Sequence, residues 1–197
     1  SPGSSPAGVS VASVLHGQYN AITVSGTTAD GNYPVQQSVS SPMNAVVGPY
    51  PLAMPAGNGC TAANYAAFPA NRIALVFFST GCGSAGLMTA AQASPNQVRG
   101  LLVVSNVAGQ FQNLGCAGTT PYIPCVSLQP ATGTFLQTNL ATAQVTMDPS
   151  LRTAANNLVG VNSSFTSRGP AWAGAGAKPD LASTGDSILS AASGQTG

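Results

Sequence analysis

The clearest hydrophobic pattern in this 197-residue chain lies near its middle and predicts a strand, a helix and a second strand. Ile73–Phe78 is a continuous apolar strand, Leu87–Ala93 is a short helix of good helix formers, and Gly100–Ser105 is another apolar strand. Because a crossover of this kind joins parallel strands with a right-handed connection, we expect the two strands to lie parallel.

A shorter copy of the same pattern follows it. Ile123–Leu128 reads as a strand, Ala131–Leu140 as a helix that opens after Pro130, and Gln144–Met147 as a strand with alternating faces.

The pattern is weaker on the N-terminal side. Ala7–Val14 and Ala21–Val24 predict two short strands, while Asp30–Asn58 is rich in Gly, Pro, Ser and Asn. We therefore expect loops with brief edge strands over Asp30–Asn58.

Composition narrows the possible functions. The chain has five Lys or Arg, four Asp and no Glu, a net charge of +1 and 44% hydrophobic residues, whereas about 25% of the residues of an ordinary domain are charged. Five scattered cations cannot form a nucleic-acid-binding face. The longest apolar run, Ile73–Phe78, is too short to span a membrane. The N-terminus lacks a signal-peptide pattern, so we expect a mature product or an excised piece.

Four cysteines, Cys60, Cys82, Cys116 and Cys125, occur without a Cys-x-x-Cys motif, and the chain has one His, so no zinc site is expected. We expect two disulfides, Cys60 with Cys82 and Cys116 with Cys125, although Cys82 pairing with a later cysteine remains open. Disulfides imply an oxidising, extracellular compartment. Asn162 begins the one N-glycosylation sequon.

No motif specifies catalysis or a cofactor. Gly81–Gly86 fits G-x-G-x-x-G, but no acidic residue follows about twenty positions later to hold a ribose. The single His16 has no evident partner for a serine nucleophile. The carboxylates that might act as a glycosidase pair, Asp30, Asp148, Asp180 and Asp186, lack a specific pattern, and Asp30 and Asp148 are typical of turns and strand ends. We expect no catalytic residue, no metal and no cofactor.

The tail carries the most specific motifs. Ser164-Phe165-Thr166-Ser167-Arg168-Gly169-Pro170 and Lys178-Pro179-Asp180-Leu181-Ala182 resemble the Ser-Phe-Ser-Ser-Arg-Gly-Pro and Lys-Pro-Asp-Val-Ala segments of subtilisin-like serine peptidases. Ser183-Thr184 replaces the Ala-Pro usual in the family before Gly185. At the other end, Ser1–Ala12 resembles the family's Gly-Ser-Pro-Gly strand.

The middle resembles a protease-associated domain, an insertion that many secreted members of that family carry. Asn71–Val76 resembles Gly-Lys-Ile-Ala-Leu-Val, Thr80–Cys82 resembles Arg-Gly-x-Cys, and Val98–Asn106 resembles Ala-x-Gly-x-Ile-Val-x-Asn. Tyr122–Leu128 resembles the strand before the second helix. The resemblance implies a β-sandwich or open barrel with two short helices, α+β but mainly β, flanked by strands of the peptidase core.

This resemblance divides the chain into residues 1–25, a strand segment of the peptidase core, residues 26–150, the protease-associated domain, and residues 151–197, a core segment that ends before the nucleophile motif. The family's catalytic Asp and His precede the matched region and its Ser follows it. The resemblance therefore implies a non-catalytic part of a secreted endopeptidase that mediates substrate access or contacts with other protein chains.

Candidate contact residues lie on loops beside the first crossover, namely Asn71, Thr80, Gly81, Phe111 and Gln112. Two other functions remain open. One is a free-standing module that holds an extended peptide along a strand edge. The other is an extracellular assembly subunit, a homo-oligomer favoured by low charge and unpaired strand edges.

Overall fold

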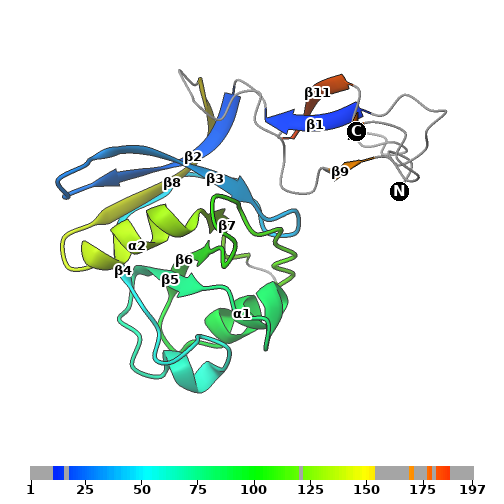
Figure 1. Ribbon diagram of the computed structural model, residues 1–197. Coiled ribbons are helices and arrows are strands. Elements are labelled where there is room, and N and C mark those ends of the chain that lie inside the picture. Colours follow the sequence, from blue (N-terminus) through cyan, green and yellow to red (C-terminus); the bar gives the residue numbers. More distant parts are fainter. Residues whose placement is uncertain are drawn as a thin grey trace, which may run out of the picture. The chain divides into compact units, whose positions relative to one another are not determined.

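The computed structural model describes residues 11–15, 18–119, 122–153, 169–170, 177–178 and 181–186 (Figure 1). The chain divides into two compact units, one formed by Asn20–Leu151 and the other by Ser1–Tyr19 together with Arg152–Gly197. Several residues of the sequence predictions lie outside the described residues, namely His16, Asn162, Asp180, the first part of the predicted strand (residues 7–10) and residues 164–168 of the tail motif.

The unit that contains both termini holds two strand pairs. Strand β1 (Val11–Leu15) pairs in parallel with β11 (Leu181–Asp186), with Val11 opposite Leu181. Strands β9 (Gly169–Pro170) and β10 (Ala177–Lys178) pair antiparallel. The expectation that strands near the two ends of the chain lie together is confirmed.

The larger unit is a seven-stranded closed barrel with two helices, which confirms the α+β, mainly β class. Its order is β2-β3-β7-β6-β5-β4-β8, so the sheet closes rather than remaining open. The strands are β2 (Gln18–Ser25), β3 (Gly31–Gln37), β4 (Val47–Ala53), β5 (Arg72–Phe77), β6 (Val98–Val104), β7 (Cys125–Leu128) and β8 (Gln144–Thr153). The helices are α1 (Gly83–Gln92) and α2 (Pro130–Thr138), with a 3-10 turn, η2 (Ala62–Tyr65).

The first predicted crossover is present. Strands β5 and β6 are parallel neighbours, with Leu75 opposite Leu102, and α1 connects them. Helix α1 begins at Gly83, four residues before the predicted start at Leu87. Its first four residues, Gly83–Gly86, are small, so the apolar pattern that marks the buried face begins one turn later.

The second predicted unit is wrong as a copy of the first, because its two strands are not neighbours. Strand β7 lies between β3 and β6, whereas β8 pairs antiparallel with β4, with Val145 opposite Tyr50. The four residues of β7 are all buried, while β8 alternates buried and less buried positions. A doubly buried strand joins the parallel part of the sheet, and an alternating strand suits an antiparallel neighbour.

The Gly- and Pro-rich segment was also predicted incorrectly, because it forms two full strands of the barrel. Strand β3 pairs with β2 and β7, and β4 pairs with β5 and β8, so neither is an edge strand. Pro49 lies within the register shift between Val47 and Tyr50. A proline is tolerated there because the ladder of hydrogen bonds is interrupted.

Two hydrophobic clusters stabilise the larger unit. The interior cluster takes residues from all seven strands and Leu136 from α2. The outer cluster lies on the opposite face of β5, β6 and β7, where α1 and η2 cover it with Leu87, Met88 and Tyr65. Side chains alternate between the two clusters, as Leu101 and Leu102 show.

Both predicted disulfides are present. Cys60 is bonded to Cys82 across 22 positions, and Cys116 to Cys125 across 9. All four cysteines belong to the outer cluster or pack against it. The disulfides therefore fasten the loops that cover one side of the barrel.

Candidate binding pocket

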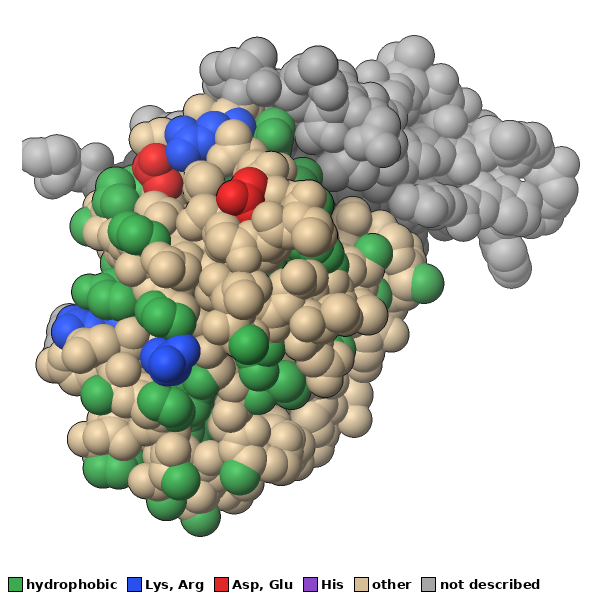
Figure 2. Space-filling view, turned by 90° about the vertical axis from the view of Figure 1, so that its left-hand side faces the viewer, with side chains coloured by type: hydrophobic (Ala, Val, Ile, Leu, Met, Phe, Trp, Pro, Cys, Tyr) green, Lys and Arg blue, Asp and Glu red, His purple; other side chains and the backbone are tan. Residues whose placement is uncertain are grey.

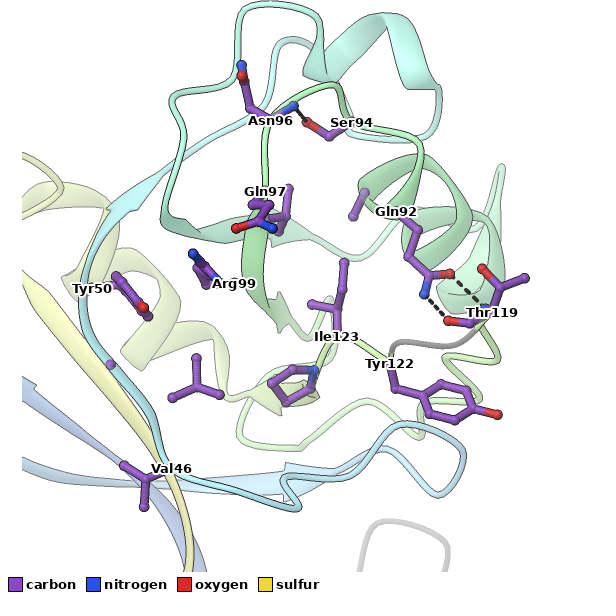
Figure 3. A pocket seen from close by; sticks show the side chains of 15 residues that line it. Val46, Tyr50, Gln92, Ser94, Asn96, Gln97, Arg99, Thr119, Tyr122 and Ile123 are labelled. Atoms are coloured by element: carbon purple, nitrogen blue, oxygen red, sulfur yellow. Dashed lines mark hydrogen bonds between the residues drawn. The ribbon is translucent and has the colours of Figure 1, made fainter.

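A pocket of about 710 Å³ opens between the end of α1, the start of β6 and the segment around β4 (Figure 3). Its volume lies in the range typical of ligand sites, about 300 to 1,000 Å³. Fifteen residues line it: Val46, Val47, Gly48, Tyr50, Ala91, Gln92, Ser94, Asn96, Gln97, Val98, Arg99, Thr119, Tyr122, Ile123 and Pro124. They all belong to the barrel unit.

Arg99 reaches this pocket from a β-bulge. On β5, Arg72 is opposite Val98 and Ile73 is opposite Gly100, so Arg99 is the extra residue at the register shift. A bulge leaves one residue unpaired and redirects its side chain. This local irregularity places a cation in the pocket at the start of an otherwise apolar strand.

The guanidinium of Arg99 is held on two sides. Its Nε donates a hydrogen bond of 2.9 Å to Oδ1 of Asn71, and Nη2 donates to the same oxygen. Its Cζ lies 5.5 Å from the centroid of the Tyr50 ring, a cation–π distance. Figure 3 shows Arg99 and Tyr50 beside each other on one wall of the pocket.

Asn71 adopts an unusual backbone conformation to make this contact. Its φ is 57°, the one positive φ of a non-glycine residue in the described part of the chain. Asn is among the residues that tolerate this left-handed region best, at a modest energetic cost. Its backbone N–H donates to the carbonyl of Gln97, another lining residue, at 3.2 Å. The conformation thus links the turn before β5 to the pocket.

Arg99 is the one charged residue among those that line the pocket. The described carboxylates have other partners: Asp148 accepts from the Ser150 backbone, and Asp30 accepts from the backbone and hydroxyl of Thr27. These Thr27 hydrogen bonds hold the pKa of Asp30 below its usual value. Figure 2 shows one face of the molecule, on which the charged side chains are few and scattered.

The opposite wall contains the side-chain amide of Gln92 and the backbone of the loop at Thr119. The side-chain amide of Gln92 donates to the carbonyl of Thr119 at 2.5 Å and accepts from its N–H at 2.9 Å, which fixes this loop to α1 (Figure 3). Beside it, Tyr122 is 52% exposed, and Val46, elsewhere on the lining, is 61% exposed. Figure 3 shows the Tyr122 ring directed away from the pocket and Val46 on the far side of the lining from it.

Of the predicted contact residues, Asn71 touches this pocket through Arg99, and the other four do not line it. Thr80 and Gly81 lie in the turn before α1, and Phe111 and Gln112 lie in the loop between β6 and β7. The Gln112 backbone N–H donates to the buried Ser127 hydroxyl at 2.7 Å. Binding by these five residues stays a prediction.

Sequence reasoning missed Tyr50 and Arg99. A lone Arg between Val98 and Gly100, at the start of an apolar strand, was the one available signal. Tyr50 lies in the segment that was predicted to be mainly loop, about fifty positions away, so no local pattern joined the two.

The glycine-rich segment serves the fold. Cys82, the second residue of Gly81–Gly86, is the N-cap residue of α1 and is bonded to Cys60. Within the described residues, no cluster of three or more His, Cys, Asp or Glu is placed to hold a metal ion. No helix of the described part is long and apolar enough to cross a membrane.

No family model and no curated protein sequence matches this chain. Its fold is similar to two structures of BSAP, a zinc aminopeptidase from Bacillus subtilis, at 19% and 17% identity with TM-scores of 0.49 and 0.47, each covering 71% of this chain and 32% of the other. It is also similar to an aminopeptidase from Aneurinibacillus sp. strain AM-1, at 14% identity with a TM-score of 0.48, over 75% and 42% of the two chains.

The chain thus spans about a third to two fifths of the length of these aminopeptidases. At such low identity and TM-score, the similarity assigns neither their activity nor their zinc to this chain.

Proposed function

We propose that this chain is the non-catalytic, protease-associated part of a secreted subtilisin-like serine endopeptidase, where it shapes the access of polypeptides or their contacts with the enzyme. In this proposal residues 26–150 are the protease-associated domain, and residues 1–25 and 151–197 belong to the peptidase core. The catalytic Asp, His and Ser come from flanking sequence.

One observation carries the proposal. Strands β1 and β11, from segments that resemble the peptidase core, pair in parallel, and the barrel lies between them in sequence. An insertion between two adjacent core strands would have this arrangement, because the host sheet re-forms on either side of it. The barrel itself is mainly β with two short helices, as the resemblance implies.

The two disulfides support secretion, since such bonds persist in oxidising compartments. The low charge and the Ser-, Thr- and Asn-rich composition suit the same setting. Secretion predicts that the protein is recovered from outside the cell with both disulfides intact.

The test is to isolate the protein from its source and treat it with a fluorophosphonate, which labels activated serine nucleophiles. We expect a labelled band, well above 19.4 kDa, whose tryptic peptides include sequences from this chain. An unlabelled protein with an intact mass near 19.4 kDa would refute the peptidase proposal. Heat-denatured material is the control for non-specific labelling.

An extracellular assembly subunit is the second candidate. The described residues include large exposed apolar side chains outside the pocket, such as Val39 at 86% exposure and Val107 at 44%, and few charges oppose association. It predicts concentration-dependent, high-mass species by light scattering, and a strict monomer at high concentration would exclude it. The strand-edge peptide module is less favoured, since each barrel strand has a neighbour on both sides.

A further inference from the structure

The pocket around Arg99 combines one cation with apolar walls, and this combination identifies a ligand chemistry. We infer that it binds an extended peptide through a carboxylate that pairs with Arg99 and an adjacent apolar side chain that packs against apolar lining residues such as Ile123. The inference deepens the proposed function and rests on it only in taking the ligand to be a polypeptide.

Arg99 supplies the charge and the geometry. Among the described residues, no carboxylate pairs with it, and its hydrogen bonds to Asn71 use Nε–H and one Nη2–H, which leaves donors on Nη1 and Nη2 for a ligand. A guanidinium presents these donors in a planar fork that matches a carboxylate. A single cation cannot hold a polyanion, so the site suits one carboxylate rather than a nucleic acid.

The guanidinium is also fixed before any ligand arrives. The bulge at Arg99, the left-handed conformation of Asn71 and the stacking on Tyr50 each restrict its position. Arg99 and Asn71 lie outside both hydrophobic clusters, and Tyr50 packs against the edge of the interior one. Backbone strain of this kind recurs at binding sites, where a preorganised side chain loses less entropy on binding.

The walls fit a peptide chain. The volume of the pocket is enough for a few amino-acid residues of a peptide, and the side-chain amide of Gln97 in its lining can form hydrogen bonds with a peptide backbone. Ile123 and Pro124 belong to the apolar part of the lining and are partly exposed in the free protein. Their burial by a leucine-sized side chain would provide the apolar part of the affinity.

The carboxylate has two possible sources, the C-terminus of a chain or an Asp or Glu side chain. Three acetylated tetrapeptides separate them: Ala-Ala-Leu-Leu as the free acid, the same peptide amidated, and amidated Ala-Glu-Leu-Leu. Each is titrated into the 197-residue chain by calorimetry and by ¹H–¹⁵N spectra that follow the Arg99 side chain. Binding of the first or the third peptide, at least about tenfold tighter than the amidated control, supports the inference and identifies the source. Equal affinity for all three peptides, or none, overturns it.

Variants then assign the effect to Arg99. We expect Arg99→Met, which keeps the aliphatic stem, to lower the affinity for the acid by about tenfold and to abolish the preference over the amide. Asn71→Gly, which accepts the left-handed backbone but lacks Oδ1, should lower the affinity several-fold by freeing the guanidinium. Arg72→Met is the matched control, a neighbouring cation that does not line the pocket. Unchanged affinity in Arg99→Met overturns the inference.

The experiments distinguish failure of the peptide-binding inference from failure of the proposed function. Fluorophosphonate labelling without carboxylate-dependent binding would leave the peptidase proposal intact and exclude this pocket. Carboxylate-dependent peptide binding without labelling would support this pocket and refute the peptidase proposal.

Discussion

The two halves of the barrel differ in how many of their faces are buried. Strands β5, β6 and β7 are covered on one face by the barrel interior and on the other by α1 and η2. Strands β2, β3 and β8 contribute to the interior cluster alone. In β6, neighbouring residues such as Leu101 and Leu102 are both fully buried, whereas in β8 the buried Val145 follows the exposed Gln144.

This difference explains why the sequence pattern predicted β5 and β6 correctly but not β3 and β4. A strand buried on both faces is a continuous apolar run, as in all-parallel sheets, and a strand buried on one face merely alternates. Asn32 and Pro34 interrupt that weaker alternation in β3, and Pro49 and Pro51 interrupt the pattern of β4, which contributes to both clusters. The doubly covered half should also carry more of the stability of the fold.

The largest expected effect is the loss of a leucine from either face of β6. Leu101→Ala and Leu102→Ala should each lower the free energy of unfolding by about 2 to 5 kcal/mol, because each leaves a cavity in a different cluster. In β8, Val145→Ala should cost about 2 kcal/mol and Gln144→Ala less than about 0.5 kcal/mol. Urea unfolding measures all four. A small effect of Leu101→Ala would show that the outer cluster contributes little to the free energy of unfolding.

Removing a disulfide should weaken the outer layer selectively. Replacing Cys60 and Cys82 by Ala should cost about 3 kcal/mol, and replacing Cys116 and Cys125 slightly less, because the closed loop is shorter. Hydrogen exchange measured by mass spectrometry should show the faster exchange in α1 and η2 first. Equal acceleration in β2 and β8 would contradict the division into two layers.

Gly133 should resist substitution by alanine although it lies within α2. A Cβ there would overlap the methyl groups of Val104 on β6. Alanine is favoured over glycine in a helix by about 1 kcal/mol, but overpacking a core costs about 1 to 3 kcal/mol. We expect a net loss of about 1 kcal/mol by thermal unfolding. Gly115→Ala is the control, because a Cβ at Gly115 has no neighbouring atom within 4 Å. Stabilisation by Gly133→Ala would show that β6 can shift to accommodate the methyl group.

The smallest expected effect concerns Tyr65 in the outer layer. Its side chain is fully buried, and its hydroxyl has no hydrogen-bond partner. Tyr65→Phe should therefore stabilise the fold by about 1 kcal/mol at pH 7. The control Tyr122→Phe, at an exposed side chain, should leave the stability unchanged.

Burial of the Tyr65 hydroxyl should also make the stability of the fold depend on pH in the alkaline range. Burial raises the pKa of its hydroxyl well above the usual value. Above about pH 10 the unfolded chain loses this proton while the folded chain keeps it, so the free energy of unfolding falls as the pH rises. Tyr65→Phe should reduce this fall in urea titrations at several pH values. An identical slope in both proteins would mean that a water or a local opening satisfies the hydroxyl.

The sequence by itself determined the elements whose evidence is local. The apolar runs at Ile73 and Gly100 predicted parallel neighbours, and the lack of a Cys-x-x-Cys motif favoured the two disulfides over a zinc site, although it left the partner of Cys82 open. The mainly β class with two helices followed from the same patterns and the resemblance.

The tertiary structure alone decided the closure of the barrel and the composition of the pocket. Strand β8 pairs with β4 and not with β7. This pairing depends on contacts between distant strands, because the register that buries the apolar side chains is the stable one. The same long-range pairing produces the bulge at Arg99 and brings Tyr50 beside it. No local pattern specifies these contacts, because the residues that make them come together only when the sheet has formed.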